Sequence, residues 1–429
     1  MTEIARDALR ALVGKATSTA IANGQPVHEL QGVAFYDTER DATVRSLASF
    51  DTAIQAVTDI PDFVTHFGTD AAERVVLQFV YEYFTRVDEL RYDEAMFDAL
   101  WLDLQTETRH PEWVTRGVAN VRHFRSEDLA IDLGDGISVR GRNSRALASL
   151  GFGPPFWELL SRDWAGPGAS SFVIVAEHTL AKRPENLVRT ESGSVWIKAI
   201  RAIGALRLAA AGDVSIGPMW FVRPAHFNVG IGGIQGTYAS VPAFGGSEYV
   251  WTELIARAYP RLYDELAQLE RDGYGKSPGN LSIALRSFMA TCDRWPPGPD
   301  SKLLDATTAL EALLGADTEI AFKLAFRVAG LVAGSDDERS AIFKLMKDFY
   351  DTRSRLVHGG HLKKKHEMRL AKVDELRSLV RRVLRAFVAF ATNPPSVYRR
   401  SFFETELDAA LVNTAEREKL RVALGLDRN

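Results

Sequence analysis

An arginine and a histidine five positions apart, Arg353 and His358, stand directly before the double glycine Gly359-Gly360. A histidine can act as a general acid or base at neutral pH, because its ordinary pKa is about 6.5. An arginine can bind a phosphate group and stabilise the negative charge that develops on it. These two residue types are what cleavage of RNA without a metal ion requires.

The helix that must position the two residues is expected over 336–358. Ser335 and Glu338 have the spacing of a capping box, and Gly359-Gly360 favours a left-handed C-cap. A histidine at such an end also has a simpler interpretation, because it complements the helix dipole. The expected apolar stripe of this helix comprises Ile342, Leu345, Met346, Phe349, Leu356 and Val357.

Arg353 falls on this apolar stripe, and a buried charge is costly unless it is paired. Glu311 lies within the apolar pattern of an earlier expected helix. We therefore predict a bidentate ion pair between Arg353 and Glu311 across two packed helices. The pair has two interpretations that the sequence leaves open: a purely structural contact, or a device that points the guanidinium toward a phosphate.

The five-residue offset has a consequence for assembly. Residues five apart lie roughly 140° apart around a helix, so one helix presents Arg353 and His358 poorly to one small target. Two copies of the helix meeting across a two-fold axis would bring both pairs into one cleft. The functional interpretation therefore predicts a homodimer.

Charge is distributed unevenly along the chain. From Arg353 to Arg400 there are 13 Lys and Arg against three acidic residues, a net charge of +10, whereas the rest carries 39 basic and 53 acidic residues, a net charge of −14. Such a segment is either a binding surface for a polyanion or an ordinary solvated helix face. Under the first interpretation, the RNA-binding residues are Arg355, Lys363, Lys364 and Lys365, with Tyr350 and Ser354 supporting the site.

Composition indicates an ordinary globular protein of more than one domain, with 46% hydrophobic and 25% charged residues over 429 positions. The first residues lack the layout of a secretory signal, and no apolar run is long enough to span a bilayer. Cys292 is the single cysteine, and no Cys/His grouping has the spacing of a zinc site. We expect a cytoplasmic protein with no membrane contact, no metal and no cofactor.

Residues 1–110 are expected to be helical, since apolar residues recur at helical spacing over 4–13, 47–57, 75–84 and 92–104. Residues 111–245 are expected to form an α+β domain of unknown role. Its predicted elements are a hairpin at 129–133 and 137–142 around Gly134-Asp135-Gly136, strands at 170–180, 219–222 and 237–241, and a helix at 194–211.

Two features of this middle region resemble a binding or catalytic site but lack the residues that such a site requires. The glycines of 230–236 resemble a dinucleotide-binding loop but lack its preceding strand and following helix. Glu177 and His178 are neighbours on a predicted strand and so point to opposite faces. No spacing links them, or Asp132 and Asp135, to a catalytic arrangement.

Residues 246–395 are expected to form an antiparallel helical bundle, because several helical segments follow one another through short linkers. Residues 396–429 are expected to add a helical tail with two short helices, at 402–411 and 414–424. The fold class is therefore multidomain α+β, mainly α. The predicted bundle helices are 251–271, 278–293, 302–314, 319–332, 336–358 and 368–391.

Three segments of this bundle, 310–314 (LEALL), 323–329 (KLAFRVA) and 349–359 (FYDTRSRLVHG), resemble the Apea-like HEPN family in order, spacing and residue type. The resemblance covers roughly 305–360, with a compatible bundle around it. It implies a four-helix-type bundle that dimerises. Ser354 stands where ribonuclease members often carry an amide or an acid, although a serine can still hydrogen-bond a phosphate.

The resemblance implies a metal-independent endoribonuclease of phage defence or of a toxin-like stress response. His358 would then serve in acid–base catalysis, and Arg353 would orient the scissile phosphate. The region before the bundle would act as a sensor or regulator that binds a protein or ligand trigger. The alternative is a non-catalytic HEPN module for dimerisation and for binding of RNA, a nucleotide or a partner protein.

Overall fold

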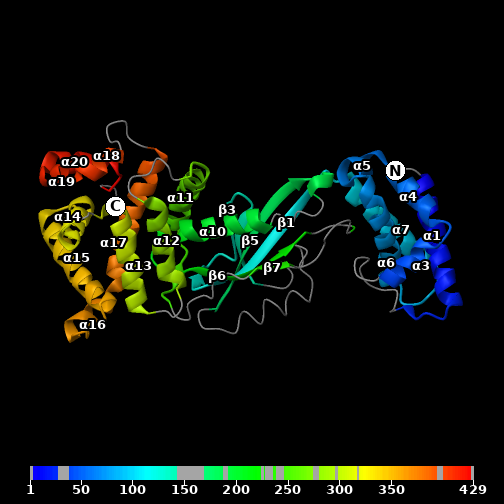
Figure 1. The fold of residues 1–429 in the computed structure, drawn as a ribbon, viewed down its shortest axis with the longest axis horizontal. Coiled ribbons are helices and arrows are strands. Elements are labelled where there is room, and N and C mark those ends of the chain that lie inside the picture. The colour runs from blue at the N-terminus through cyan, green and yellow to red at the C-terminus, as the bar shows by residue number, and fades with distance from the viewer. Residues whose placement is uncertain are drawn as a thin grey trace.

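A computed structural model of the chain describes residues 3–27, 38–142, 169–186, 192–223, 227, 235–237, 246–273, 280–294, 298–315, 318–393 and 400–426. The described chain is elongated, with helices at both ends and an antiparallel sheet between them (Figure 1). The expected α+β class with mainly helical content is confirmed. None of the described helices combines the length and apolar character needed to cross a membrane.

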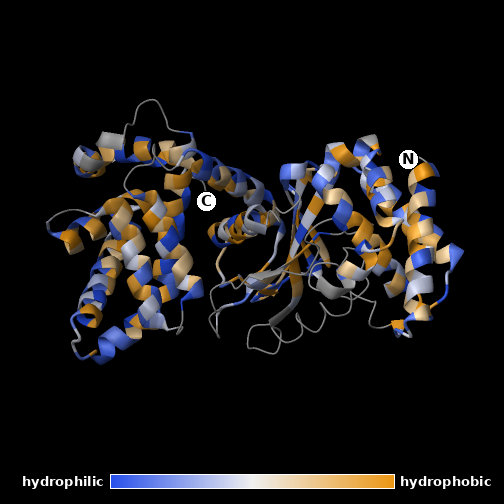
Figure 2. Cartoon of the chain, turned by 45° about the vertical axis from the view of Figure 1, so that its right-hand side comes forward, coloured by the Kyte–Doolittle hydropathy of each residue, from blue (hydrophilic) through white to orange (hydrophobic). Residues whose placement is uncertain are grey.

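The N-terminal helices form a core of their own. Leu9, Phe63, Phe79 and Phe97 are fully buried in it, and apolar and polar residues alternate around these helices as amphipathic packing requires (Figure 2). The elements are α1 (Glu3–Ala22), α3 (Thr38–Arg45), α4 (Phe50–Thr58), α5 (Pro61–Phe67), the 3-10 turn Thr69–Ala71, α6 (Ala72–Arg86) and α7 (Glu94–Arg109).

The central sheet has six strands in the order β3-β4-β5-β1-β6-β7, and every neighbouring pair is antiparallel. One face packs on α10 (Ser192–Ala209). Of the glycine-rich segment 230–236, only Gln235 and Gly236 fall among the described residues, in β7. The strands are β1 (Glu112–Arg122), β3 (Ala130–Gly134), β4 (Ile137–Gly141), β5 (Ala169–Ala181), β6 (Ser215–Val222) and β7 (Gln235–Thr237), and β2 (Phe124–Arg125) pairs in parallel with β8 (Tyr249–Val250).

The central strand β1 is absent from the predicted elements. It is buried on both faces along much of its length, so it lacks the simple alternation that marks the predicted hairpin. The strand contains Gly117 at the point where α10 comes close. A Cβ at Gly117 would lie 2.6 Å from Val195 Cγ1 and 2.7 Å from Met219 Sδ. The strand therefore depends on contacts that are distant in sequence.

The predicted hairpin is confirmed, and its turn is anchored to two helices. Gly134, Asp135 and Gly136 all have positive φ, as a tight turn of this type requires. Asp135 accepts hydrogen bonds from Lys198 of α10 (2.8 Å) and from the hydroxyl of Tyr263 on α11 (2.7 Å). Burial raises the pKa of Asp135, but these two hydrogen bonds outweigh it and leave the pKa below its ordinary value. This aspartate has a structural role.

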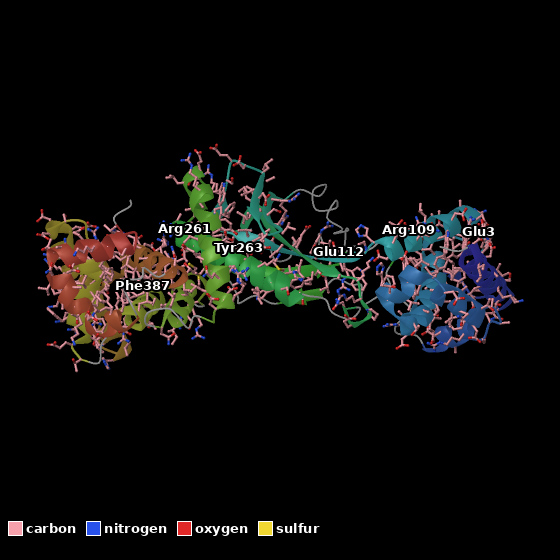
Figure 3. All side chains as sticks on the ribbon, turned by 90° about the horizontal axis from the view of Figure 1, so that it is seen from above. Glu3, Arg109, Glu112, Arg261, Tyr263 and Phe387 are labelled. Carbon is pink, nitrogen blue, oxygen red and sulfur yellow. The ribbon has the colours of Figure 1, made fainter. Side chains whose placement is uncertain are left out.

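A buried ion pair fastens the N-terminal helices to the sheet, close to where Arg109 and Glu112 are labelled in Figure 3. Lys182, at the end of β5, donates to the carboxylate of Glu107 in α7 at 2.6 Å, and both residues are only 3% exposed. Trp113 Nε1 donates to the same carboxylate oxygen at 3.1 Å. One carboxylate thus joins α7, β1 and β5.

The C-terminal helices continue the apolar core of the sheet, which extends from Ala119 to Leu426. The helix expected at 368–391 is in fact two helices, because the chain turns at Ala371 and Lys372; the first tail helix likewise breaks at Glu406. The elements are the 3-10 turn Pro184–Asn186, α11 (Glu253–Arg271), α12 (Leu281–Asp293), α13 (Pro299–Leu314), α14 (Ile320–Val332), α15 (Asp336–Val357), α16 (Lys364–Leu370), α17 (Val373–Thr392), α18 (Arg400–Thr405), α19 (Leu407–Val412) and α20 (Thr414–Ala423).

Asp213, which precedes β6, is the centre of a buried charge network in this core. Its carboxylate accepts hydrogen bonds from Arg377 of α17 (2.5 Å), from Lys302 of α13 (3.0 Å) and from the backbone N–H of Ser247 (2.8 Å). Burial raises the pKa of Asp213, but the charges of Arg377 and Lys302 outweigh that effect and lower it to about 2. The carboxylate is therefore ionised at neutral pH.

Gly117→Ala should destabilise the fold by about 1–3 kcal/mol, because the added methyl group meets Val195 and Met219 in a filled core. Gly14→Ala in α1 is the matched control, since nothing lies within 4 Å of its Cβ position, and it should leave stability unchanged or raise it slightly. Urea unfolding curves of both variants measure the difference. Equal midpoints would show that the sheet does not need a glycine at this position.

Acid should remove the contribution of Asp213 to stability. Its folded pKa of about 2 lies below the ordinary value of 3.8, so the contribution is complete above pH 3.8 and is lost as pH falls toward 2. Asp213→Asn should destabilise the protein by about 3–5 kcal/mol at neutral pH. Its stability should also depend less on pH than that of the parent as the pH falls below 3.8. Asp88→Asn, an exposed carboxylate, is the control. Thermal unfolding from pH 7 to pH 2.5 tests the prediction, and parallel acid profiles for parent and Asp213→Asn would contradict it.

Candidate functional site at the C-terminal end of helix α15

Helix α15 begins with a variant of the predicted capping box. The hydroxyl of Ser335 accepts a hydrogen bond from Glu338 N (3.2 Å), as the pattern predicts. The carboxylate of Glu338 accepts from the N–H of Gly334 at 2.7 Å instead of from Ser335. Two N–H groups at the start of the helix are therefore satisfied. The first is the predicted one, and the second belongs to Gly334, the residue before the expected Ser335.

The buried face of α15 is close to the predicted stripe but differs at its end. Ile342, Met346 and Phe349 are buried as expected, whereas Val357 is 50% exposed. Thr352 is also fully buried. Its hydroxyl can be buried because it donates to the carbonyl of Asp348 in the same helix at 2.8 Å. The helix therefore leaves the core about one turn before its end.

The end of α15 is a Schellman motif that leaves His358 in solvent. Gly360 N donates to Arg355 O at 2.8 Å, and Gly359 N donates to Leu356 O at 3.3 Å. Gly359 has a φ of 66°, the left-handed conformation predicted for it. His358 is the C-cap residue and not the last helical residue; its side chain is exposed, and its backbone N–H donates to Ser354 O at 3.1 Å.

Arg353, Glu311 and Tyr350 form one cluster. Arg353 Nη2 donates to Glu311 Oε2 of α13 at 3.3 Å, so the predicted partner is present, but the bidentate geometry is wrong. Glu311 Oε1 and Arg353 Nε are both buried without a hydrogen-bond partner. The guanidinium carbon lies 5.5 Å from the ring centroid of Tyr350. Burial, followed by the charge of Glu311, raises the pKa of Tyr350.

A second cluster, which the sequence did not predict, surrounds Asp351. Its carboxylate pairs with Arg355 (3.5 Å) and Lys365 (3.1 Å) and lies 3.1 Å from Nε2 of the buried His366. His366 Nδ1 accepts from the N–H of Lys363, so its proton is on Nε2 and points at Asp351. Burial raises the pKa of Asp351, and the hydrogen bonds from Lys365 and His366 more than offset it, so the pKa is lowered.

The Asp351 cluster fixes α16 against α15 and so positions the predicted basic residues. Arg369 of α16 also pairs with Asp348 of α15. Lys363 and Lys364 are exposed and have no ion-pair partner among the residues that the structure describes. The spacing of Asp351 and Arg355, four residues apart, could have revealed one of these pairs, but the approach of His366 depends on the turn between the two helices.

The basic segment 353–400 divides into two groups. Arg377 and Arg381 of α17 are buried, and Arg381 Nε donates to the carbonyl of Arg207 at 2.7 Å. Burial and the charge of Arg377 lower the pKa of Arg381 to about 10. These two arginines lie in the core and are out of reach of a ligand, whereas Lys363, Lys364 and Lys365 at the start of α16 are exposed.

The arrangement offers an exposed imidazole and a half-buried guanidinium at the end of α15, and two exposed amines at the start of α16. No three His, Cys, Asp or Glu side chains gather closely enough to hold a metal ion in the described part of the chain. In the middle region, Glu177 pairs with Arg116 of β1 at 2.6 Å, so this residue too has a structural partner. The chemistry that the end of α15 can perform is proton transfer beside a bound phosphate.

Gly359→Ala should destabilise the protein by about 1 kcal/mol and loosen the end of α15, because φ is 66° there while no atom lies within 4 Å of the added methyl group. Gly360→Ala is the matched control, since its Cβ position lies in ordinary contact with Arg355 at 3.5 Å and its φ is not left-handed. Chemical denaturation gives the stability difference. A larger loss for Gly360→Ala would rule out backbone strain at the cap as the cause.

No family model, curated protein or solved structure matches this chain.

Proposed function

We propose that this chain is a metal-independent endoribonuclease of the Apea-like HEPN type, with Arg353 and His358 as catalytic residues. The observation that carries the proposal is the end of α15, where a Schellman cap leaves His358 in solvent about one turn after the guanidinium of Arg353, whose Nε has no hydrogen-bond partner. An exposed imidazole can donate or accept a proton, which is what a general acid or base must do.

The proposed reaction is internal transfer at an RNA phosphate. The 2′-oxygen forms a bond to the adjacent phosphorus and loses its proton to a base, while the bond from phosphorus to the 5′-oxygen breaks and that oxygen takes a proton. The products are a cyclic phosphate and a free 5′-hydroxyl. Arg353 would stabilise the additional negative charge on the phosphate in the transition state.

Two protons must move on opposite sides of the phosphate, and one copy of α15 has one such histidine at its end. We propose that two copies meet across a two-fold axis, so that one His358 acts as the base and the other as the acid. The roughly 140° between Arg353 and His358 on one helix supports this arrangement, because each copy would supply its arginine to the cleft from a different side. Exposed Lys363 and Lys364 would bind the flanking phosphates.

A non-catalytic module for binding RNA, a nucleotide or a partner is the second candidate. The contact between Arg353 and Glu311 favours it, because a carboxylate at 3.3 Å competes with a phosphate for the guanidinium. Both candidates use the same positive end of α15. They differ in whether His358 transfers protons. Regulation by the preceding regions, in phage defence or in a toxin-like response, belongs to the first candidate.

His358→Ala should lower RNA cleavage by at least about 100-fold while leaving RNA affinity nearly unchanged, because it removes the proton donor and no phosphate contact. Cleavage of a mixed pool of labelled RNAs by purified protein in EDTA measures the first quantity, and fluorescence polarisation measures the second. His361→Ala, the next exposed histidine along the chain, is the matched control and should cleave normally. If the parent protein cleaves none of these RNAs, the ribonuclease proposal fails and the binding module remains.

A further inference from the structure

Three phenylalanines of α14 and α15 contact one another. These two helices lie at the end of the molecule farthest from the N-terminal helices (Figure 1). Phe322 is 51% exposed. Its ring meets that of Phe343 edge to face, with centroids 5.6 Å apart, and lies parallel to that of Phe326 at 6.3 Å. Phe326 and Phe343 are partly buried against the core, and they hold the exposed ring of Phe322 at the surface. An exposed apolar cluster of this kind, which we call the phenylalanine platform, is a candidate binding surface.

The platform borders an open groove of about 420 Å³ between α14, α15 and α19. Phe326 and Phe343 line it from the platform side, and Leu411 and Val412 line it from α19. Val412 is 73% exposed, so the far wall of the groove is also apolar and open to solvent. The groove has room for flat, apolar groups beside the rings.

Cations accompany the rings. Lys347 Nζ lies 5.7 Å from the ring centroid of Phe343, and Lys344, beside Phe343 in α15, is exposed. Of the nearby carboxylates, Asp408 is already paired with Arg327 at 2.6 Å, and that pairing lowers its pKa. The surface thus combines aromatic faces with amines, which is the pattern that binds bases and phosphates of single-stranded nucleic acid.

The platform and the candidate site lie along the same helix. Phe343, Lys347 and Tyr350 are spaced at four and three residues, which places them on one side of α15. Phe343 and Arg353 are ten residues apart, or about 15 Å along the helix. The guanidinium of Arg353 lies over the ring of Tyr350, so another aromatic ring lies beside the residue proposed to hold the scissile phosphate.

We propose that the phenylalanine platform, with Lys347, binds unpaired bases of single-stranded RNA and directs that strand to Arg353 and His358. This inference rests on the proposed function and adds its substrate class. In a duplex the faces of the bases are covered by their neighbours, so only an unpaired strand offers them to the rings. The site would therefore act on loops and single strands.

The test measures binding in the His358→Ala background, where the RNA stays intact. The probes are a fluorescein-labelled single-stranded oligouridylate of about twelve nucleotides and a perfect duplex of the same length. Phe322→Leu keeps an apolar side chain of similar size but removes the aromatic face, and it should weaken single-strand binding roughly tenfold while leaving duplex binding unchanged. Lys347→Gln should weaken single-strand binding less, and with a smaller salt dependence than the parent.

Two control variants keep the outcome specific. Val422→Ala removes an exposed apolar side chain on α20, and Lys15→Gln removes an exposed amine on α1; neither should change the affinity for the oligouridylate. Circular dichroism and thermal unfolding establish that Phe322→Leu is folded, as expected for a half-exposed side chain.

The outcomes separate the platform from the ribonuclease. If Phe322→Leu binds the oligouridylate as tightly as its parent, the platform is refuted, while cleavage in EDTA by the wild-type chain still decides the ribonuclease. If Phe322 matters for binding but the wild-type chain cleaves nothing, the platform stands in an RNA-binding module. A Phe322→Leu variant that changes mass in light scattering but not RNA affinity would identify the platform as a protein contact and overturn the inference.

Discussion

The buried carboxylate of Asp213 is the interaction on which the larger part of the structure depends. An ionised carboxylate in the core is stable only with partners in place, and its partners come from α13, α17 and the segment before β8. Two glycines make this approach possible: a Cβ at Gly246 would lie 2.7 Å from Asp213, and one at Gly212 would lie 2.7 Å from Tyr249. The sheet and the bundle are therefore one body, in agreement with their continuous apolar core.

The buried network around Asp213 also affects which cationic side chains of the chain are exposed to a ligand. Arg377 points into the core, where it pairs with Asp213, and Arg381 donates to the carbonyl of Arg207. The buried Arg207 in turn pairs with Asp293 at 2.5 Å. Helix α17 thus turns much of its charge inward, away from any ligand. A net charge counted along a segment measures both roles together, and exposed lysines such as Lys363 and Lys364 are the part that an anionic ligand can reach.

Local rules explain which elements could be predicted. The hairpin around Asp135 and both ends of α15 follow from turn and cap residues that act within a few positions, and the sequence contains them. Strand β1 could not be predicted in the same way, because its burial depends on α10 reaching Gly117. The burial of Arg377 and the contact of His366 with Asp351 likewise depend on elements that meet only in the folded chain.

The Arg353–Glu311 pair could be predicted only in part, and its geometry affects what the site can bind. Its partners could be predicted, because each is a charge set in an apolar stripe, but packing determines how closely they meet. A bidentate pair would satisfy both groups and hold the guanidinium against α13. The single contact leaves Glu311 Oε1 and Arg353 Nε buried without partners, which is an energetic cost within the folded chain. A single contact leaves the rest of the guanidinium able to donate to a phosphate oxygen, whereas a bidentate pair would occupy it, so the imperfect pair favours an anion at Arg353 more than a complete pair would.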